Sequence, residues 1–546
     1  MLFLQSGIIE EINPVGAMRF PFMDHLKRRF PARISWQTWF VLGFFLAFLV
    51  MGLILYPDYG LHWDSVTQMD TGKVNYEYIF KGSKTLLNYR TRYYGPVFEI
   101  ILYAITQSMP LRQMFFTRNL LIFLDFYVGV FFFYLLARKL TRRWELGLLV
   151  AFFLIASPRI FADGFYNARD IPLLTAFIIA VYTLMLYLEQ KTYRHAILHA
   201  LASAFLVAHR IPGFLIPALT ISLLGIHILF RSSPVTRTRW LWSGLLYTAL
   251  TAGLIYLFWP ILWHDPLGEL INAFGEARAY PWRGGIVFYR GQFLDAKQLP
   301  WHYVPVWVLV TTPFLYIISA TIGFGKGALQ LFLKPGKILD PQKQNFIILT
   351  AWLVLPWLAV ALTHATLYDA WRHLFFIYPP ILLFAIQGIQ AVFSLRLPRV
   401  NPRLFQGILA ALIILGILDP TLFMVRYHPF ENVYFNRLAG EDMQEIKRKY
   451  ELDYWGLSYR KGLEYILAND PSAPIPIYVE NQPGEINEIL LPEAQQKRLH
   501  YVSNPQKAKY YLTNYRWHPQ PYDYPDEVFS IVVGDASIFS VFQLKP

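Results

Sequence analysis

An aspartate that directly follows the first apolar segment is the strongest candidate for a residue that does chemistry. Asp64 lies in the stretch Tyr56–Ser65, which is too polar to be buried in lipid. A carboxylate at this boundary between lipid and water lies where a lipid-linked substrate presents its head group. We interpret Asp64 as a general base for an attacking hydroxyl, a role that typically accelerates a reaction about 10²–10⁴-fold. The alternative is that Asp64 caps a helix that begins at Ser65.

A second carboxylate, Asp170, occupies a similar position before a later apolar segment. It precedes Ile171 and Pro172, and Asp163 in the same stretch is a weaker competitor for the same role. Asp before a proline-led apolar run is also a common helix start, so the structural alternative is open for Asp170 as well.

Several arginines in predicted loops could hold a phosphate, because the planar guanidinium offers two directed hydrogen bonds. Arg210 is the most informative, since it lies in a very short turn between two apolar segments, on the predicted side of Asp64. Its alternative role is to extend toward lipid phosphates at the membrane surface. The full set of candidates is Arg90, Arg92, Arg210, Arg278 and Arg372.

A divalent metal is an open alternative, although the sequence requires no cofactor. His62 and Asp64 are two residues apart, and His264 and Asp265 are adjacent, so both pairs could supply ligands. Pairs of this kind near a membrane surface are more often hydrogen-bonded to backbone or water. The chain has no cysteine, which excludes disulfides, thiolate catalysis and cysteine-based metal sites.

Long apolar runs must position these residues. The 546-residue chain is 55% hydrophobic and only 16% charged. Runs of about twenty apolar residues are typical of transmembrane helices. We therefore predict a polytopic α-helical membrane protein with about eleven spans, at residues 36–56, 116–136, 144–156, 172–188, 196–208, 214–230, 241–259, 303–324, 346–362, 375–393 and 404–425.

Basic residues between the spans predict the orientation. Four cations, Arg138, Lys139, Arg142 and Arg143, follow the second span, and basic residues favour the cytoplasmic side. The same rule applied to the basic segment before residue 36 places the N-terminus inside and Asp64 outside. This assignment requires the apolar segment 96–109 to be an interfacial or re-entrant helix, because about fourteen residues is short for a span.

The composition changes after the last span. Residues 1–425 form the predicted transmembrane domain, with external loops at 57–115, 157–171 and 260–302, and residues 426–546 form a small external α/β domain. Its predicted elements are a helix at 456–469 and strands at 475–479, 508–513, 528–533 and 538–544. We expect this domain to cover the site or select the acceptor. The formal net charge of +13 is attributed to cytoplasmic loops, with no nucleic-acid partner.

The chain resembles the GT-C glycosyltransferases, in the branch that contains protein O-mannosyltransferases and the lipid A aminoarabinose transferase. The likeness covers roughly residues 36–393. It rests on the order of several short segments: His62-Trp63-Asp64, Tyr94-Gly95-Pro96, the stretch 166–172, the turn 209–213, and the third-loop stretches 259–266 and 299–303. Segments 428–436 and 451–456 resemble bacterial members that have a C-terminal external domain, which suggests a prokaryotic inner or plasma membrane.

The resemblance implies an inverting transfer of a sugar from a polyprenyl-phosphate donor to a hydroxyl of a protein, lipid or glycan at the external face. Asp64 would be the base, Asp170 would orient the acceptor or the surroundings of Asp64, and Arg210 would hold the donor phosphate. Membrane lipids are the other expected partners. The chain departs from the family in having Ser65 after Asp64, where members often have glutamate, and Gly95 before Pro96, where members sometimes have lysine.

Two other functional classes are compatible with the sequence. One is a lipid or sugar transporter or flippase, although transporters commonly place polar residues near mid-membrane. The other is a non-catalytic assembly protein, which the serine at position 65 would allow.

Overall fold

The structure is a computed structural model that describes residues 35–230, 233–282, 284–333, 340–396, 398 and 400–544. The chain forms two compact units, Met1–Leu49 and Val50–Pro546. All the candidate site residues belong to the second unit. The basic segment that carries the orientation argument at the N-terminus, with Arg19, Lys27, Arg28, Arg29 and Arg33, lies outside the described residues.

Long apolar helices make this chain an integral membrane protein. Within the described residues, nine helices are long and apolar enough to cross a membrane. They are α2 (Trp36–Leu55), α5 (Leu111–Thr141), α8 (Asp170–Gln190), α10 (Leu215–Phe230, extended by the 3₁₀ turn η2, Ile211–Phe214), α11 (Pro234–Phe258), α14 (Phe314–Leu333), α15 (Pro341–Thr363), α16 (Tyr378–Phe393, preceded by the 3₁₀ segment η4, Arg372–Ile377) and α17 (Pro402–Tyr427).

Three of the eleven predicted spans differ from the observed helices. The third, 144–156, is the 12-residue helix α6 (Trp144–Ile155), which is shorter than a full span. After Ser157 the chain bends by 71° into α7 (Pro158–Tyr166), in the stretch that was predicted as a loop. The fifth, α9 (Tyr193–Val207), has 15 residues and is shorter than a full span. The eighth is divided at Thr312, which is extended because Pro313 follows it, giving α13 (Tyr303–Thr311) and then α14.

Shorter elements fill the predicted external loops. The segment 96–109 is the ten-residue helix α4 (Val97–Thr106), which is about 15 Å long and therefore half the length of a span. The first loop also contains α3 (Ser65–Lys81), and the third contains α12 (Pro266–Arg278) and an antiparallel hairpin, β1 (Ile286–Tyr289) with β2 (Gln292–Asp295). The second predicted loop is mostly α7, all of whose residues are buried.

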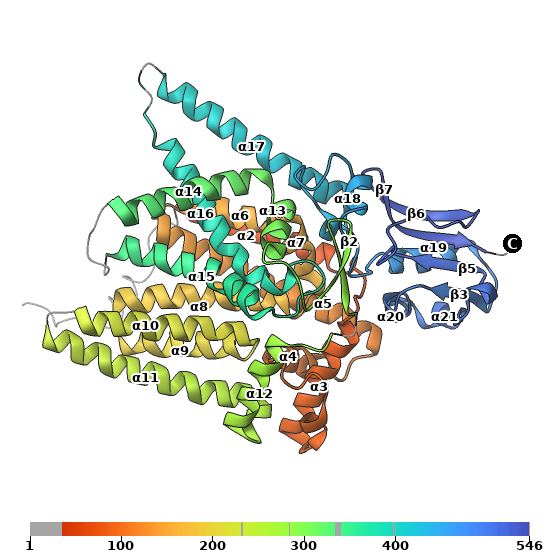
Figure 1. Cartoon of the computed structure of the whole chain (residues 1–546), viewed down its shortest axis with the longest axis horizontal. Helices are drawn as coiled ribbons and strands as arrows, with labels where there is room; N and C mark the ends of the chain where they lie inside the picture. The colour runs from red at the N-terminus through yellow and green to blue at the C-terminus, as the bar shows by residue number, and fades with distance from the viewer. Residues whose placement is uncertain are drawn as a thin grey trace, which may run out of the picture. The chain divides into compact units, whose positions relative to one another are not determined.

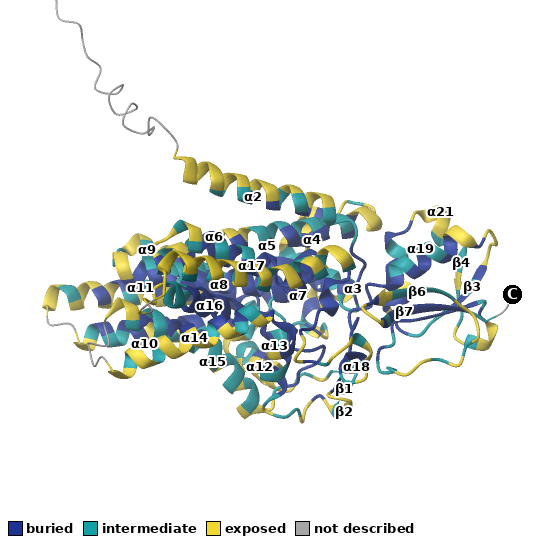
Figure 2. Cartoon of the chain, turned by 90° about the horizontal axis from the view of Figure 1, so that it is seen from above, coloured by how far each residue is buried: buried dark blue, intermediate teal, exposed yellow. Residues whose placement is uncertain are grey.

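The core of the helical region surrounds α8 and α16, which are the most buried long helices, whereas α11 and α17 expose apolar side chains along their length (Figure 2). Exposed apolar side chains on these helices fit contact with lipid. Helices α14 and α16 approach closely at Gly323 and Gly388, where a Cβ on either residue would lie 1.9 Å from a backbone oxygen of the other helix. Small residues permit this close packing of membrane helices.

The C-terminal region forms a five-stranded mixed sheet at one end of the helical region (Figure 1). The strand order is β4 (Leu499–Tyr501), β3 (Ile475–Val479), β5 (Tyr510–Thr513), β7 (Ala536–Gln543) and β6 (Glu527–Val533). β3 is parallel to both β4 and β5, whereas β7 is antiparallel to β5 and β6. Four helices accompany the sheet: α18 (Met443–Lys447), α19 (Tyr459–Asn469), α20 (Pro483–Ile486) and α21 (Glu493–Gln496).

The sheet and Asp64 lie at the same end of the helical region. Trp63 Nε1 donates to the carbonyl of Tyr454 at 3.0 Å, and the Leu61 amide donates to Asn487 Oδ1 at 2.8 Å. The segment that carries Asp64 is therefore bonded directly to the region that was predicted as a separate external domain. Residues 426–546 belong to the same compact unit as the membrane helices from residue 50 onward.

We predict that this end of the protein faces outward. Because the chain has no cysteine, single exposed positions can be labelled at Thr67→Cys in α3, Ser472→Cys in the sheet region, and Gln190→Cys at the far end of α8. A membrane-impermeant thiol reagent on intact cells should label the first two and spare the third, since α8 spans about 30 Å. Labelling of Gln190→Cys without labelling of Thr67→Cys would show that the orientation is the reverse of the predicted one.

Candidate functional site

A single buried arginine holds three carboxylates together. Arg372 contacts Asp64 Oδ2 through Nη2 at 3.3 Å, Asp170 Oδ2 through Nη1 at 3.1 Å, and Asp369 Oδ2 through Nη2 at 3.1 Å. Its side chain is only 2% exposed. A buried charge is stable only when it is paired, so the position of this guanidinium and those of the three carboxylates depend on one another.

The turn before η4 brings Asp369 to Arg372. Asp369 and Ala370 have φ angles of 56° and 61°, in the left-handed region that non-glycine residues seldom adopt. This turn places the Asp369 carboxylate beside a guanidinium three residues further along the chain. Strained backbone of this kind persists where the surrounding contacts fix it, and it is frequent at functional sites.

Asp170 is the first residue of α8 and is almost fully buried. Its amide hydrogen bonds to Asn167 Oδ1 at 2.9 Å, and the Asn167 side-chain amide donates to Asp170 Oδ2 at the same distance. Its other oxygen, Oδ1, forms an ion pair with Arg210. Asp170 therefore lies at the start of a helix, as the structural alternative predicted. Its side chain, however, forms ion pairs with Arg210 and Arg372 instead of capping the helix.

Asp64 is the most accessible carboxylate of the cluster. Its side chain is 30% exposed, whereas those of Asp170 and Asp369 are at most 5% exposed. Asp64 precedes α3, as the capping alternative requires, but its side chain makes no capping hydrogen bond. Its backbone amide instead donates to His62 Nδ1 at 3.2 Å, and His62 Nε2 lies 3.1 Å from the carbonyl of Tyr166.

Asp64 is ionised at neutral pH. Partial burial acts to raise the pKa of this carboxyl group, but the positive charges of Arg372 and Arg169 outweigh burial and hold the pKa below its ordinary value. Burial lowers the pKa of His62 to about 4, so the imidazole is neutral and serves to orient the Asp64 backbone. An ionised, accessible carboxylate is able to accept a proton from a bound hydroxyl.

Arg169 is a functional candidate that is absent from the set of arginines predicted from the sequence. It donates to Thr71 Oγ1 at 3.3 Å, and within the described residues it forms no ion pair with a carboxylate. Its guanidinium carbon lies 4.4 Å from the centre of the Tyr94 ring, and that of Arg210 lies 5.6 Å from the same ring. The adjacency of Arg169 to Asp170 in the sequence was the signal that could have identified it.

An apolar cavity of about 560 Å³ lies beside this cluster. Arg210, Tyr94, Tyr280, Tyr368 and Arg278 line its polar portion, and the remaining wall is largely apolar. Wall residues come from η2 and α10, α12, α15 and η4, and include Leu215, Phe274, Leu355, Ala359, Val360 and Phe376. A mostly apolar cavity with a few convergent polar groups is typical of a ligand site.

The five arginines that were predicted to bind phosphate lie in different surroundings, and only some of them line the cavity. Arg210 and Arg278 line the cavity, and Arg372 is occupied by the three carboxylates. Arg90 is exposed and lies 3.5 Å from the carbonyl of Pro281, and Arg92 packs over Tyr93, so neither lines the cavity. Arg210 and Arg278 are thus the predicted residues that geometry places where a phosphate could enter.

The predicted metal ligands are engaged in other contacts. Both ring nitrogens of His62 are hydrogen-bonded to the backbone, and Asp265 caps α12 by accepting from the Gly268 amide at 3.1 Å. His264 is exposed and lies 3.4 Å from Glu269. Among the residues that the structure describes, three or more histidine and carboxylate ligands do not come together as a metal site.

The C-terminal region contributes side chains to the cluster, which the sequence did not indicate. The guanidinium of Arg372 lies 4.5 Å from the ring centre of Trp455, and Trp455 Nε1 donates to Asp163 Oδ1 at 3.2 Å. Arg516 reaches Asp369 with a nitrogen–oxygen distance of 2.5 Å. Ion pairs join three aspartates, Asp64, Asp170 and Asp369, to three arginines, Arg210, Arg372 and Arg516, so their formal charges balance. The neighbouring Arg169 adds a positive charge that suits an anionic ligand.

The solved structures that match nearly the whole chain include two of one protein. These two are crystal structures of ArnT from Cupriavidus metallidurans, one bound to undecaprenyl phosphate and one in the apo state. Each has a TM-score of 0.47 and covers 98% of the ArnT chain; the first is 12% identical over 93% of this chain, and the second is 11% identical over 92%. No family model and no curated protein matches the chain.

Replacing Arg372 should destabilise the protein strongly. Arg372→Met would leave three carboxylates near one another without their shared cation, and breaking a buried ion pair typically costs about 3–5 kcal/mol. Thermal unfolding of the purified protein in detergent should show a clearly lower Tm for this variant. Arg90→Met, at an exposed arginine, is the matched control and should melt as the wild type does. Equal Tm values for the two variants would contradict the central role of Arg372.

Proposed function

We propose that the protein is an inverting glycosyltransferase that transfers a sugar from a polyprenyl-phosphate carrier to a hydroxyl acceptor at the external membrane face. The observation that carries the proposal is an ionised, accessible carboxylate in an arginine-rich cluster, beside a largely apolar cavity. This combination suits a substrate that has an apolar chain, a negative phosphate and a reactive sugar.

The cavity accounts for the lipid and the phosphate of the donor. Its wall from α15, with Leu355, Ala359 and Val360, offers apolar surface to a polyprenyl chain. Arg210 lies in the polar portion, and Arg169 shares the Tyr94 ring with it. We assign the donor phosphate to these two arginines, because together they supply a charge that no carboxylate fully compensates.

The reaction follows from these positions. The acceptor oxygen attacks C1 of the sugar from the side opposite the phosphate, so the configuration at C1 inverts. The bond between C1 and the phosphate oxygen breaks, and its electron pair leaves with the polyprenyl phosphate. Asp64 takes the proton of the acceptor hydroxyl, and Arg169 and Arg210 stabilise the charge that develops on the leaving phosphate.

Asp170 has a supporting role in this proposal. Its two oxygens hold Arg210 and Arg372, so it fixes a phosphate-binding arginine and the cation beside Asp64 at the same time. We therefore assign Asp170 to the orientation of the surroundings of Asp64, which was one of the two roles that the sequence resemblance implied.

The location of the charges argues against transport. Asp170 begins α8, and Arg372 begins the segment that leads into α16, so both lie at helix ends. Transporters commonly place their polar residues at interrupted helices near the bilayer midplane. The ordered contacts of Asp64 and the adjoining cavity also favour catalysis over a purely structural role.

Asp64→Asn is the direct test. Asparagine keeps the shape of the side chain but accepts no proton near neutral pH, so we expect turnover to fall by about 10²–10⁴-fold while donor binding is retained. The rate is measured as release of free polyprenyl phosphate from polyprenyl-phosphate sugars in membranes that contain the protein. Asp58→Asn is the matched control, because Asp58 lies in the same segment but contacts His428 instead of Arg372. Near-normal turnover in a folded Asp64→Asn variant would defeat the mechanism.

A further inference from the structure

We propose that the C-terminal region completes the catalytic centre, and that Arg516 is a positioning residue for Asp64. This inference rests on the proposed glycosyl transfer, and it assigns the C-terminal region a role beyond covering the site or selecting an acceptor. The link runs from Arg516 to Asp369, from Asp369 to Arg372, and from Arg372 to Asp64.

Arg516 is buried and is held by an ion pair, a hydrogen bond and two aromatic rings. Nη2 lies 2.5 Å from Asp369 Oδ1, Nη1 donates to the carbonyl of Tyr454 at 2.7 Å, and the side chain is 3% exposed. Its guanidinium carbon lies 4.7 Å from the ring centre of Trp63 and 4.5 Å from that of Trp517. Because Trp63 is adjacent to Asp64 in the chain, Arg516 contacts the catalytic segment both directly and through Asp369.

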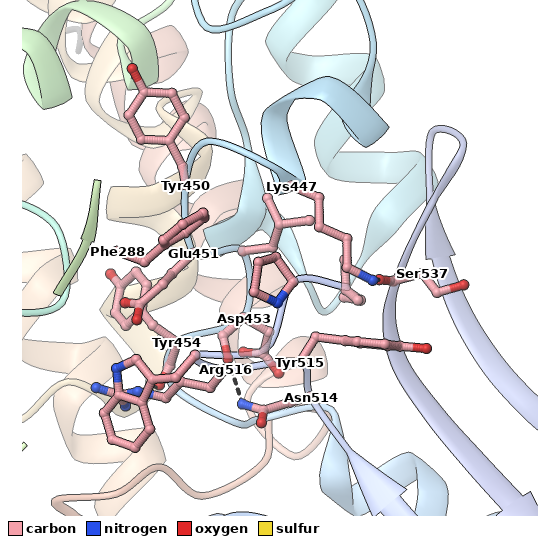
Figure 3. A pocket seen from close by; sticks show the side chains of 14 residues that line it. Phe288, Lys447, Tyr450, Glu451, Asp453, Tyr454, Asn514, Tyr515, Arg516 and Ser537 are labelled. Atoms are coloured by element: carbon pink, nitrogen blue, oxygen red, sulfur yellow. Dashed lines mark hydrogen bonds between the residues drawn. The ribbon is translucent and has the colours of Figure 1, made fainter. Parts of the chain in front are cut away.

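The sheet delivers Arg516 to this position. Arg516 lies in the loop after β5, which is flanked by the parallel strand β3 and the antiparallel strand β7. The carboxyl ends of parallel strands are where α/β sheets commonly bind their ligands. Here the loop is held by Asn514, whose side-chain amide donates to the carbonyl of Asp453 at 2.8 Å (Figure 3).

The same loop carries backbone strain next to Arg516. Tyr515 and Trp517 have φ angles of 57° and 61°, and bulky residues adopt this left-handed region only when their surroundings require it. Figure 3 shows Arg516 beside Tyr454 and Asn514 in the small enclosed space between this loop and the segment 447–454. The two strained residues on either side of Arg516 indicate that the surrounding contacts fix the loop, and with it the position of the Arg516 side chain.

Removing Arg516 should change both the geometry and the electrostatics of Asp64. Asp369 would lose one of its two cations, so its full negative charge would act on Arg372 and draw that guanidinium away from Asp64. The nearby charge of Arg516 also lowers the pKa of Asp64, along with the charges of Arg372 and Arg169. Its loss should therefore raise the pKa of Asp64. A purely structural arginine elsewhere in the sheet region would have neither effect.

The test compares Arg516→Met with Arg516→Lys and Arg498→Met, using the full-length protein and polyprenyl-phosphate sugar donors. Arg498 is the matched control, since it binds backbone carbonyls within the sheet region, including that of Leu467 at 3.1 Å. We expect Arg516→Met to lower kcat by about 10²-fold with little change in KM for the donor, because a displacement of about 1 Å in the catalytic group has an effect of this size. The acid limb of its pH–rate profile should move to higher pH.

Arg516→Lys should recover part of the rate, and Arg498→Met should leave kcat and the acid limb unchanged. If Arg516→Met fails to fold, the double variant Asp369→Asn/Arg516→Met is used instead. It removes both partners of the ion pair, so the net charge of the site is unchanged. It should be no slower than Asp369→Asn alone, because both changes interrupt the same link. Wild-type kcat and acid limb in Arg516→Met, or additive losses in the double variant, would overturn the positioning role. An inactive wild type would instead overturn the proposed function itself.

Discussion

The site depends on one buried positive charge that is shared among carboxylates from distant parts of the chain. Arg372 can remain buried only because Asp64, Asp170 and Asp369 surround it, and those carboxylates can lie near one another only because Arg372 lies among them. Arg210 and Arg516 extend the network at Asp170 and Asp369. The result is a cluster in which Asp64 alone keeps substantial exposure and is therefore free to react.

The same network joins the two parts of the protein that the composition distinguishes. The sheet region contributes Arg516 and Trp455 to the cluster, and it is bonded to the segment 57–64 through the Trp63 and Leu61 contacts. The membrane region contributes the cavity and the two arginines beside Tyr94. The membrane region thus supplies the proposed lipid cavity, and the sheet region helps to hold the segment that carries the proposed base. The arginine–aspartate contacts set the position of the base relative to the cavity.

Much of the architecture could be predicted from the sequence, because apolar runs and strand patterns are local signals. Each of the nine full-length helices overlaps a predicted span, although α14 (Phe314–Leu333) extends beyond the predicted end at residue 324. β3 and the turn between β6 and β7 at Gly534 and Asp535 were also predicted. One error came from Pro313, which divides the predicted span 303–324. Others came from short elements that were not predicted: the buried helix α7 in the stretch 157–171, the strand β4 and the β1–β2 hairpin. Local propensity does not show how a run of apolar residues is interrupted in three dimensions.

The site was less predictable, since its contacts are remote in sequence. Asp64 was predicted as a site residue because it follows the first span. The partners of Arg372, however, lie 308 and 202 residues away at Asp64 and Asp170, and Arg516 lies 147 residues from Asp369. Asp369 and Arg516 carry no local pattern that distinguishes them from surface charges. For this reason Arg372 was expected to bind phosphate, whereas the structure commits it to carboxylates.

The most direct measurement is an experimental structure of the purified protein with polyprenyl phosphate. Our account predicts that the phosphate lies within hydrogen-bond distance of Arg169 and Arg210, with the chain along the apolar wall of α15 and Asp64 facing the position of the missing sugar. A lipid phosphate bound at the opposite end of the helices, or a chain that leaves the α15 cavity empty, would contradict it.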